Sequence, residues 1–119
     1  GVLDGGSETQ READSEFEVF VMDQVRAMCY EPVPQVGVAG YFVDIGVRHP
    51  DWPHGFVRGV ECDGASYHSA KSARDRDRLR QEVLEGLGWR FHRIWSTDWF
   101  NNPRREAERL RAVLAARME

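Results

Sequence analysis

Apolar side chains recur along the chain with two different periods, and each change of period marks a change of secondary structure. Between Phe17 and Met28 they follow helical spacing, which predicts a helix over residues 16–29. Pro32 and Pro34 are expected to end it. Three short strand-like runs then follow, separated by glycine and proline: residues 35–38, 41–47 and 56–62.

The second half of the chain alternates helix, strand and helix. A helix is predicted over residues 72–87, and its inward stripe is expected to be Leu79, Val83, Leu84 and Leu87. Residues 89–95 are expected to form a fourth strand, and Asn102-Pro103 opens a last helix. The buried stripe of that helix is expected to be Ala107, Leu110, Val113 and Leu114. The order αβββαβα predicts an α/β (α+β) domain in which helices cover a mixed sheet.

Length and composition describe one small domain. A chain of 119 residues suits a single core. Residues 1–14 are rich in glycine and acids and are expected to be a disordered lead or linker remnant, with residues 15–119 as the domain. No apolar run approaches the ~20 residues of a membrane helix, so we expect no membrane partner. Two cysteines form no disulfide framework, which favours a cytoplasmic protein.

The formal net charge of −4 argues against a nucleic-acid partner until its distribution is considered. Residues 1–18 hold six acids and one arginine, whereas residues 71–80 hold five basic residues and two acids. Lys71 is the only lysine among 16 basic residues, and arginine suits a polyanion because it binds phosphate in a bidentate manner. A genome rich in G and C explains the same bias.

Acidic residues interrupt two neighbouring strands. In the strand pattern, Val43, Ile45 and Val47 point to one side and Asp44 to the other, where Gly46 leaves space. The next strand places Val57, Gly59, Glu61 and Asp63 on one face. Carboxylates that converge at strand ends repel each other, and a divalent cation relieves the repulsion. Capping of strands and pairing with arginines are the alternatives.

These residues resemble a known family, the PD-(D/E)XK restriction-endonuclease-like nucleases, and more closely the very-short-patch-repair-like endonuclease domain. The resemblance rests on an ordered set that spans residues 15–105: Ser15-Glu16-Phe17-Glu18, Gln35, Asp44, Glu61-Cys62-Asp63-Gly64, Tyr67-His68, Arg74 with Arg78, Gly88 and Arg93. It implies a four-stranded mixed sheet flanked by helices and cleavage of DNA that depends on Mg²⁺ or Mn²⁺. Asp44, Glu61 and Asp63 would then hold the metal together with the Cys62 carbonyl. Such domains often belong to larger helicase-related proteins of DNA repair or defence.

The sequence departs from this family at one position. The usual motif ends in lysine, which orients the attacking water and stabilises the transition state, but residue 63 is aspartate. Asp63 could instead extend the metal site, and His68 or Lys71 could supply the missing base or positive charge. A structural histidine and a solvated lysine are the alternatives. For Glu18 the resemblance implies an accessory metal-site acid, whereas Ser15-x-x-Glu18 also fits a helix capping box.

Four residues are candidates for binding nucleic acid. Arg74 and Arg78 lie one helical turn apart and are expected to contact phosphates, or else to pair with acids across helix turns. The resemblance adds Gln35 and Arg93. The predicted partners are DNA, with single-stranded and branched forms left open, and the rest of a larger polypeptide. The alternatives to a nuclease are an inactive nucleic-acid-binding module and an interaction or regulatory domain.

Overall fold

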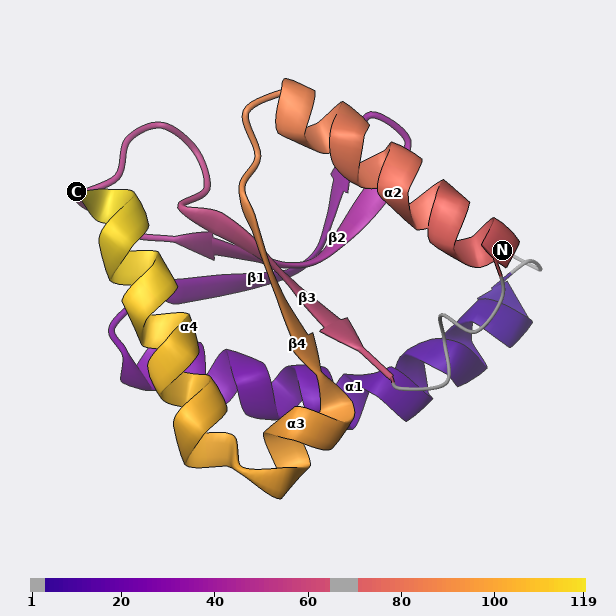
Figure 1. Ribbon diagram of the computed structural model, residues 1–119, viewed down its shortest axis with the longest axis horizontal. Helices are drawn as coiled ribbons and strands as arrows, with labels where there is room; N and C mark the ends of the chain where they lie inside the picture. Colours follow the sequence, from indigo (N-terminus) through magenta and orange to yellow (C-terminus); the bar gives the residue numbers. More distant parts are fainter. Residues whose placement is uncertain (1–3, 65–70) are drawn as a thin grey trace.

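A computed structural model describes residues 4–64 and 71–119, and it describes the side chains of residues 16–64 and 75–119. Figure 1 shows the elements in chain order, and their bounds are α1 (Asp4–Ala27), β1 (Glu31–Val38), β2 (Tyr41–Arg48), β3 (Arg58–Asp63), α2 (Lys71–Gly86), β4 (Phe91–Trp95), α3 (Ser96–Asn101) and α4 (Pro103–Met118). The predicted order αβββαβα is confirmed, with the short helix α3 added before the last helix. None of the described helices is long and apolar enough to cross a membrane.

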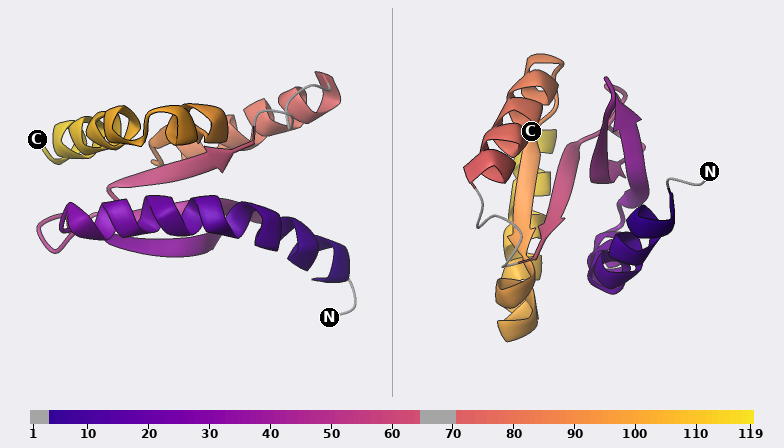
Figure 2. Two further views of the ribbon diagram at one scale, coloured as in Figure 1. Left: turned by 90° about the horizontal axis from the view of Figure 1, so that it is seen from below. Right: turned by 90° about the vertical axis from the view of Figure 1, so that its right-hand side faces the viewer.

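The sheet has four strands in the order β1-β2-β3-β4. β1 and β2 are antiparallel, β2 and β3 are antiparallel, and β3 and β4 are parallel, so the predicted mixed sheet is confirmed. β2 and β3 pair only from Ile45–Val60 to Val47–Arg58. Figure 2 shows that the two strand pairs, β1–β2 and β3–β4, diverge beyond this short contact.

The strands predicted over residues 56–62 and 89–95 begin two residues later, at Arg58 and Phe91, and two other boundaries differ more. α1 begins at Asp4 rather than near residue 16, whereas the division into a lead and a domain stays a prediction. β1 begins at Glu31 and contains both Pro32 and Pro34, which were expected to lie outside a strand. A strand accepts proline at the edge of a sheet, where the missing N–H breaks no ladder bond, and β1 is the edge strand.

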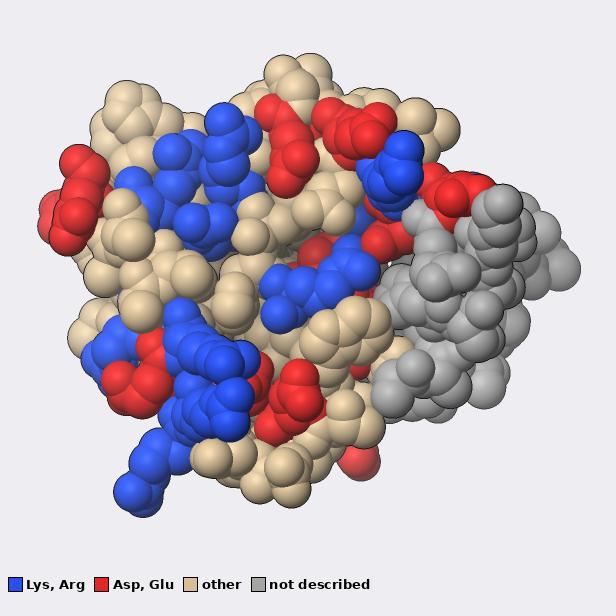
Figure 3. All heavy atoms as spheres, viewed as in Figure 1, with Lys and Arg blue, Asp and Glu red and all other residues tan. Residues whose placement is uncertain are grey.

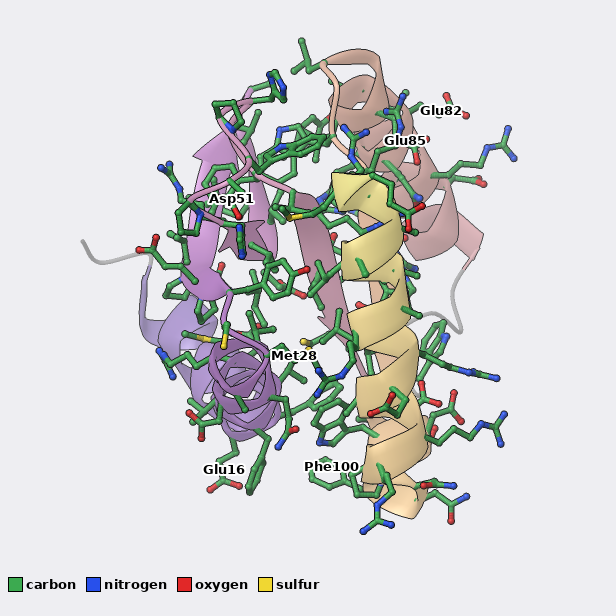
Figure 4. All side chains as sticks on the ribbon, turned by 90° about the vertical axis from the view of Figure 1, so that its left-hand side faces the viewer. Glu16, Met28, Asp51, Glu82, Glu85 and Phe100 are labelled. Atoms are coloured by element: carbon green, nitrogen blue, oxygen red, sulfur yellow. The ribbon has the colours of Figure 1, made fainter. Side chains whose placement is uncertain are left out.

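The main core lies between one face of the sheet and helices α1, α3 and α4. It contains Val21 and Val25 of α1, Ile45 of β2 and Leu110 of α4, all fully buried. Met28 also points inward from the end of the α1 segment toward α4 (Figure 4). The predicted stripe of α4 is confirmed, and Asn102 caps this helix, because its side-chain oxygen accepts a hydrogen bond from the backbone N–H of Arg105.

The stripe predicted for α2 is wrong. Leu79, Val83 and Leu87 are exposed, and only Leu84 is buried. The covered side of α2 is instead polar and is formed by Asp77, Arg80 and Leu84, which follow at intervals of three and four residues. In Figure 4, Glu82 and Glu85 point away from the domain. The helix is therefore held to the sheet by ionic contacts rather than by an apolar face.

The other face of the sheet carries a column of stacked aromatic rings. Phe56 stacks on Trp89 at 5.1 Å between ring centroids, and Trp89 stacks on Phe91 at 5.9 Å. The guanidinium of Arg48 lies over the outer face of Phe56 at 4.4 Å from its centroid, and that of Arg80 lies 5.8 Å from the centroid of Phe91. Aromatic and cationic stacking thus joins the β2–β3 loop to α2.

Gly46 and Gly59 form the floor beneath these rings. A Cβ on Gly46 would lie 2.7 Å from Phe56, and a Cβ on Gly59 would lie 2.7 Å from Phe91. Gly46 therefore makes room for an aromatic ring rather than for Asp44, which corrects the sequence interpretation. Val43 is a second correction, because it is buried beside Gly59 instead of joining Ile45 in the main core. Val57, which precedes β3, is a third: it lies in the main core rather than on the face of Glu61.

Candidate active site

The predicted acidic residues lie where β2 and β3 separate. Beyond the pair Ile45–Val60, hydrogen bonds from backbone groups to side chains replace the backbone hydrogen bonds between the two strands. One carboxylate oxygen of Asp44 accepts a hydrogen bond from the backbone N–H of Cys62 at 2.9 Å. Glu61 in turn accepts one from the backbone N–H of Asp44 at 3.1 Å. The two carboxylates therefore bridge the fork between the strands and hold each other's backbone in place.

Both acids have raised pKa values. Burial raises the pKa of Asp44 from 3.8 to about 7, with a further contribution from the negative charge of Glu61, while the hydrogen bond from Cys62 acts in the opposite direction. The pKa of Glu61 is also raised, because burial outweighs the stabilisation by Arg80. Negative charge at this fork is therefore costly without additional positive charge.

Two arginines supply part of that positive charge. Arg80 of α2 forms an ion pair with Glu61, and its guanidinium donates a hydrogen bond to the backbone carbonyl of Phe42 at 2.7 Å. Arg93 of β4 binds Asp63 at 2.9 Å through Nε, and it binds Asp77 at 2.7 Å. These contacts fix α2 against the ends of β3 and β4.

Asp77 and Arg80 were missed by the sequence analysis, which placed apolar residues on the covered side of α2. The sequence does contain a sign of this covered side. Asp77, Arg80 and Leu84 are spaced by three and four residues, so an acid, a base and a large apolar residue share one face of the helix. Charged side chains can cover a sheet when each has an ionic partner, and both of these do.

Glu18 approaches the acidic fork from α1. Its two carboxylate oxygens lie 3.4 and 3.5 Å from the amide nitrogen of Gln35, and its charge contributes to the raised pKa of Asp44. Ser15 lies inside α1, so the capping-box interpretation is wrong: the helix begins eleven residues earlier, at Asp4. Gln35 has a φ of +52° and lies where the β1–β2 register skips one pair, opposite Asp44.

A comparison with known protein families finds a family that matches most of this chain. The REase_MTES_1575 family, which is restriction endonuclease-like, matches residues 17–114. The chain belongs to this family. No curated protein and no solved structure gives a significant match. The match includes all four strands together with Glu18, Asp44, Glu61, Asp63 and Asp77. The restriction-endonuclease-like fold is thus confirmed, and the domain is of a nuclease type.

Among the side chains that the structure describes, those of residues 16–64 and 75–119, no group of three or more His, Cys, Asp or Glu is arranged to hold a metal ion. Asp44 and Glu61 lie together beside the backbone of Cys62, whereas Asp63 is an ion-pair partner of Arg93. The Cys62 thiol is buried and its pKa lies well above its ordinary value, mainly because of burial, so it stays neutral.

The other candidates are separated from the fork or lie beyond what is described. Arg78 is 81% exposed and forms an ion pair with Glu82 at 3.5 Å, which is the pairing alternative raised from the sequence. His68 lies outside the described residues. Lys71 and Arg74 belong to α2, but their side chains are outside the described part. Their roles, like those of Gln35 and Arg93 toward nucleic acid, stay predictions.

Proposed function

We propose that this domain is a metal-dependent endonuclease that hydrolyses phosphodiester bonds in DNA with Mg²⁺ or Mn²⁺. We further propose that it is of the very-short-patch-repair-like type, within a larger helicase-related protein of DNA repair or defence. One observation carries the proposal: the half-buried Asp44 and the buried Glu61 lie together in the fork of β2 and β3 in a chain of a restriction endonuclease-like family. Membership of the family supports nuclease chemistry, and the acids support its dependence on a metal.

The donor atoms fit a hard divalent cation. Asp44 of β2 and Glu61 of β3 offer carboxylate oxygens, and Cys62, the residue after Glu61 on β3, offers a backbone carbonyl. Because the pKa of Asp44 is about 7, part of this carboxyl is protonated at neutral pH without a metal. A cation bound nearby would favour its ionised form. When bound, Mg²⁺ or Mn²⁺ supplies positive charge that stabilises the phosphate in the transition state.

The remaining residues position the acids and the phosphate. The Cys62 N–H orients the Asp44 carboxylate, and Arg80 orients Glu61. Arg93, held between Asp63 and Asp77, brings a guanidinium against the aspartate that replaces the family's lysine, and it can attract a phosphate to this part of β4. Asp63 then acts mainly through Arg93. Lys71 and His68 stay candidates for the base, and Glu18 for an accessory acid.

The test compares Asp44→Asn with a matched control, Asp51→Asn. Asp51 is an exposed acid in the loop between β2 and β3 (labelled in Figure 4), and its ionic partner is His49 rather than a residue of the fork. Labelled single- and double-stranded DNA are incubated with Mg²⁺, Mn²⁺ or EDTA, and Mg²⁺ binding is measured by calorimetry. We expect the wild type and Asp51→Asn to cleave only with metal, and Asp44→Asn to lose both cleavage and Mg²⁺ binding. Cleavage by Asp44→Asn at the wild-type rate would exclude Asp44 from the site.

A nucleic-acid-binding module without catalysis is the second candidate. It is favoured by Asp63 in place of lysine and by the arginines that already pair with Glu61 and Asp63. The same experiment separates the two functions. An inactive module binds DNA in EDTA as well as in Mg²⁺, and it shows neither cleavage nor calorimetric Mg²⁺ binding.

A further inference from the structure

Three arginines gather at the end of the sheet opposite the acidic fork. Arg58 begins β3, Arg90 lies just before β4, and Arg117 lies in the last turn of α4. Each guanidinium is anchored by backbone carbonyls: Arg58 by Val113 and Phe91, Arg117 by Val57, and Arg90 by Trp89 and Glu85. We call Arg58, Arg90 and Arg117 the arginine cluster.

Among the described side chains, no carboxylate forms an ion pair with any of the three arginines of this cluster. The pKa of Arg58 is lowered by burial and then by the charges of Arg117 and Arg90, so Arg58 lies within reach of both positive charges. The pKa of the neighbouring His92 is lowered as well, first by burial and then by Arg58. An anion would relieve the repulsion between Arg58 and the other two arginines.

Backbone anchoring leaves the cluster able to bind such an anion. An arginine has five N–H donors, and the carbonyl contacts use only one or two on each guanidinium. Arg90 is exposed, and Arg58 and Arg117 are half-buried. Figure 3 shows basic side chains gathered over the C-terminal end of α4 and the segment that leads into β4, and further basic side chains on the same face over the middle of the molecule. The viewed face therefore carries positive charge at the C-terminal end of α4 and also in other places.

The spacing of the cluster from the fork suits a nucleic-acid duplex. Arg58 is the first residue of β3, and Glu61 of the acidic fork is the fourth. Three steps of a strand span ~10 Å, which corresponds to about 3 base pairs at a rise of 3.4 Å per base pair. We propose that the arginine cluster is a phosphate-binding surface that holds the backbone of duplex DNA about 3 base pairs from the bond at the acidic fork. This inference rests on the proposed function.

The test measures binding in EDTA, so that it does not depend on cleavage. A labelled 20-base-pair duplex is titrated by fluorescence anisotropy at several salt concentrations, with the wild type, Arg90→Gln and the double variant Arg90→Gln/Arg117→Gln. Loss of two phosphate contacts should lower the salt slope by about 2 and weaken binding about thirtyfold at 0.15 M salt. The single variant Arg90→Gln removes an exposed guanidinium that binds the backbone carbonyls of Glu85 and Trp89. It should lower the salt slope by about 1 and weaken binding about fivefold.

The matched control is Arg26→Gln/Arg111→Gln, which removes two exposed arginines that pair with acids on α1 and α4. We expect this control to keep nearly the wild-type slope. A cluster variant that binds with the wild-type slope, or a control that loses as much as the cluster variant, overturns the proposal. A wild type that binds no duplex overturns it as well. If the wild type binds but cleaves nothing with any metal, the cluster stands and the nuclease proposal fails.

Discussion

Replacing Asp44 with asparagine should stabilise the metal-free domain by an amount that grows as the pH rises from 5 to 8. The pKa of Asp44 is about 7 in the folded protein, against an ordinary value of 3.8. Between these values the carboxyl is protonated when folded and ionised when unfolded, so the folded state binds the extra proton. The free energy of unfolding therefore falls as the pH rises through this window. Asparagine does not titrate, and its carbonyl oxygen can still accept the hydrogen bond from Cys62.

The shift sets the size of the effect. A difference of about three pKa units corresponds to about 4 kcal/mol when it is fully realised. We expect Asp44→Asn to exceed the wild type by about 4 kcal/mol at pH 8 and by about 1.5 kcal/mol at pH 5, because at pH 5 the carboxyl is already ionised in the unfolded chain and still protonated in the folded one.

Urea unfolding in EDTA, measured at pH 5 and pH 8, tests this expectation, with Asp51→Asn as the control. Mg²⁺ provides a second arm: at a hundred times its dissociation constant it should stabilise the wild type by about 2.7 kcal/mol and leave Asp44→Asn unchanged. A stability difference between Asp44→Asn and the wild type that is the same at both pH values would refute the reasoning, because the fork would then place no constraint on the ionised carboxylate.

Two further substitutions test the contacts that support the fork. Arg80→Gln leaves the buried Glu61 without its ion pair and should lower the free energy of unfolding by about 3 kcal/mol at pH 8, measured in urea. The loss should be smaller at pH 5, where Glu61 can be protonated. An equal loss at both pH values would mean that packing rather than charge is lost. Gly59→Ala places a methyl group 2.7 Å from Phe91 and should cost about 2 kcal/mol, whereas Gly37→Ala, whose nearest contact is 3.5 Å, should change the unfolding free energy by much less. Similar costs for the two alanines would argue against the glycine floor.

The order of elements could be predicted because each strand and most helices carry a clear hydrophobic period. The pairing of Asp44 with Glu61 was also predictable in outline, since two acids on neighbouring apolar strands must lie near each other if the strands pair. Their hydrogen bonds to the backbone of the opposite strand were not predictable, because these bonds form only where β2 and β3 separate. Periodicity assumes a regular ladder, and the ladder between β2 and β3 stops at Ile45 and Val60.

The errors share a physical cause. The inward side of α2 was predicted from its apolar residues, but its ionic side is the one that packs against the sheet, where Arg80 meets Glu61 and Asp77 meets Arg93. A single sequence shows which residues are charged, but it does not show which charges will meet. Gly46 was likewise read through its neighbour in sequence, Asp44, although the ring of Phe56 occupies the space above it.

The prolines of β1 also bear on how this domain behaves at high concentration. An edge strand presents unpaired N–H and C=O groups to which another chain can add a strand, and this is a common route to aggregation. Pro32 and Pro34 lie two residues apart, so they share one side of the strand, and neither has an N–H to offer. Half of the exposed edge therefore cannot complete a ladder with a second molecule. The two prolines that obscured the first residues of β1 in the sequence should therefore disfavour self-association through this edge.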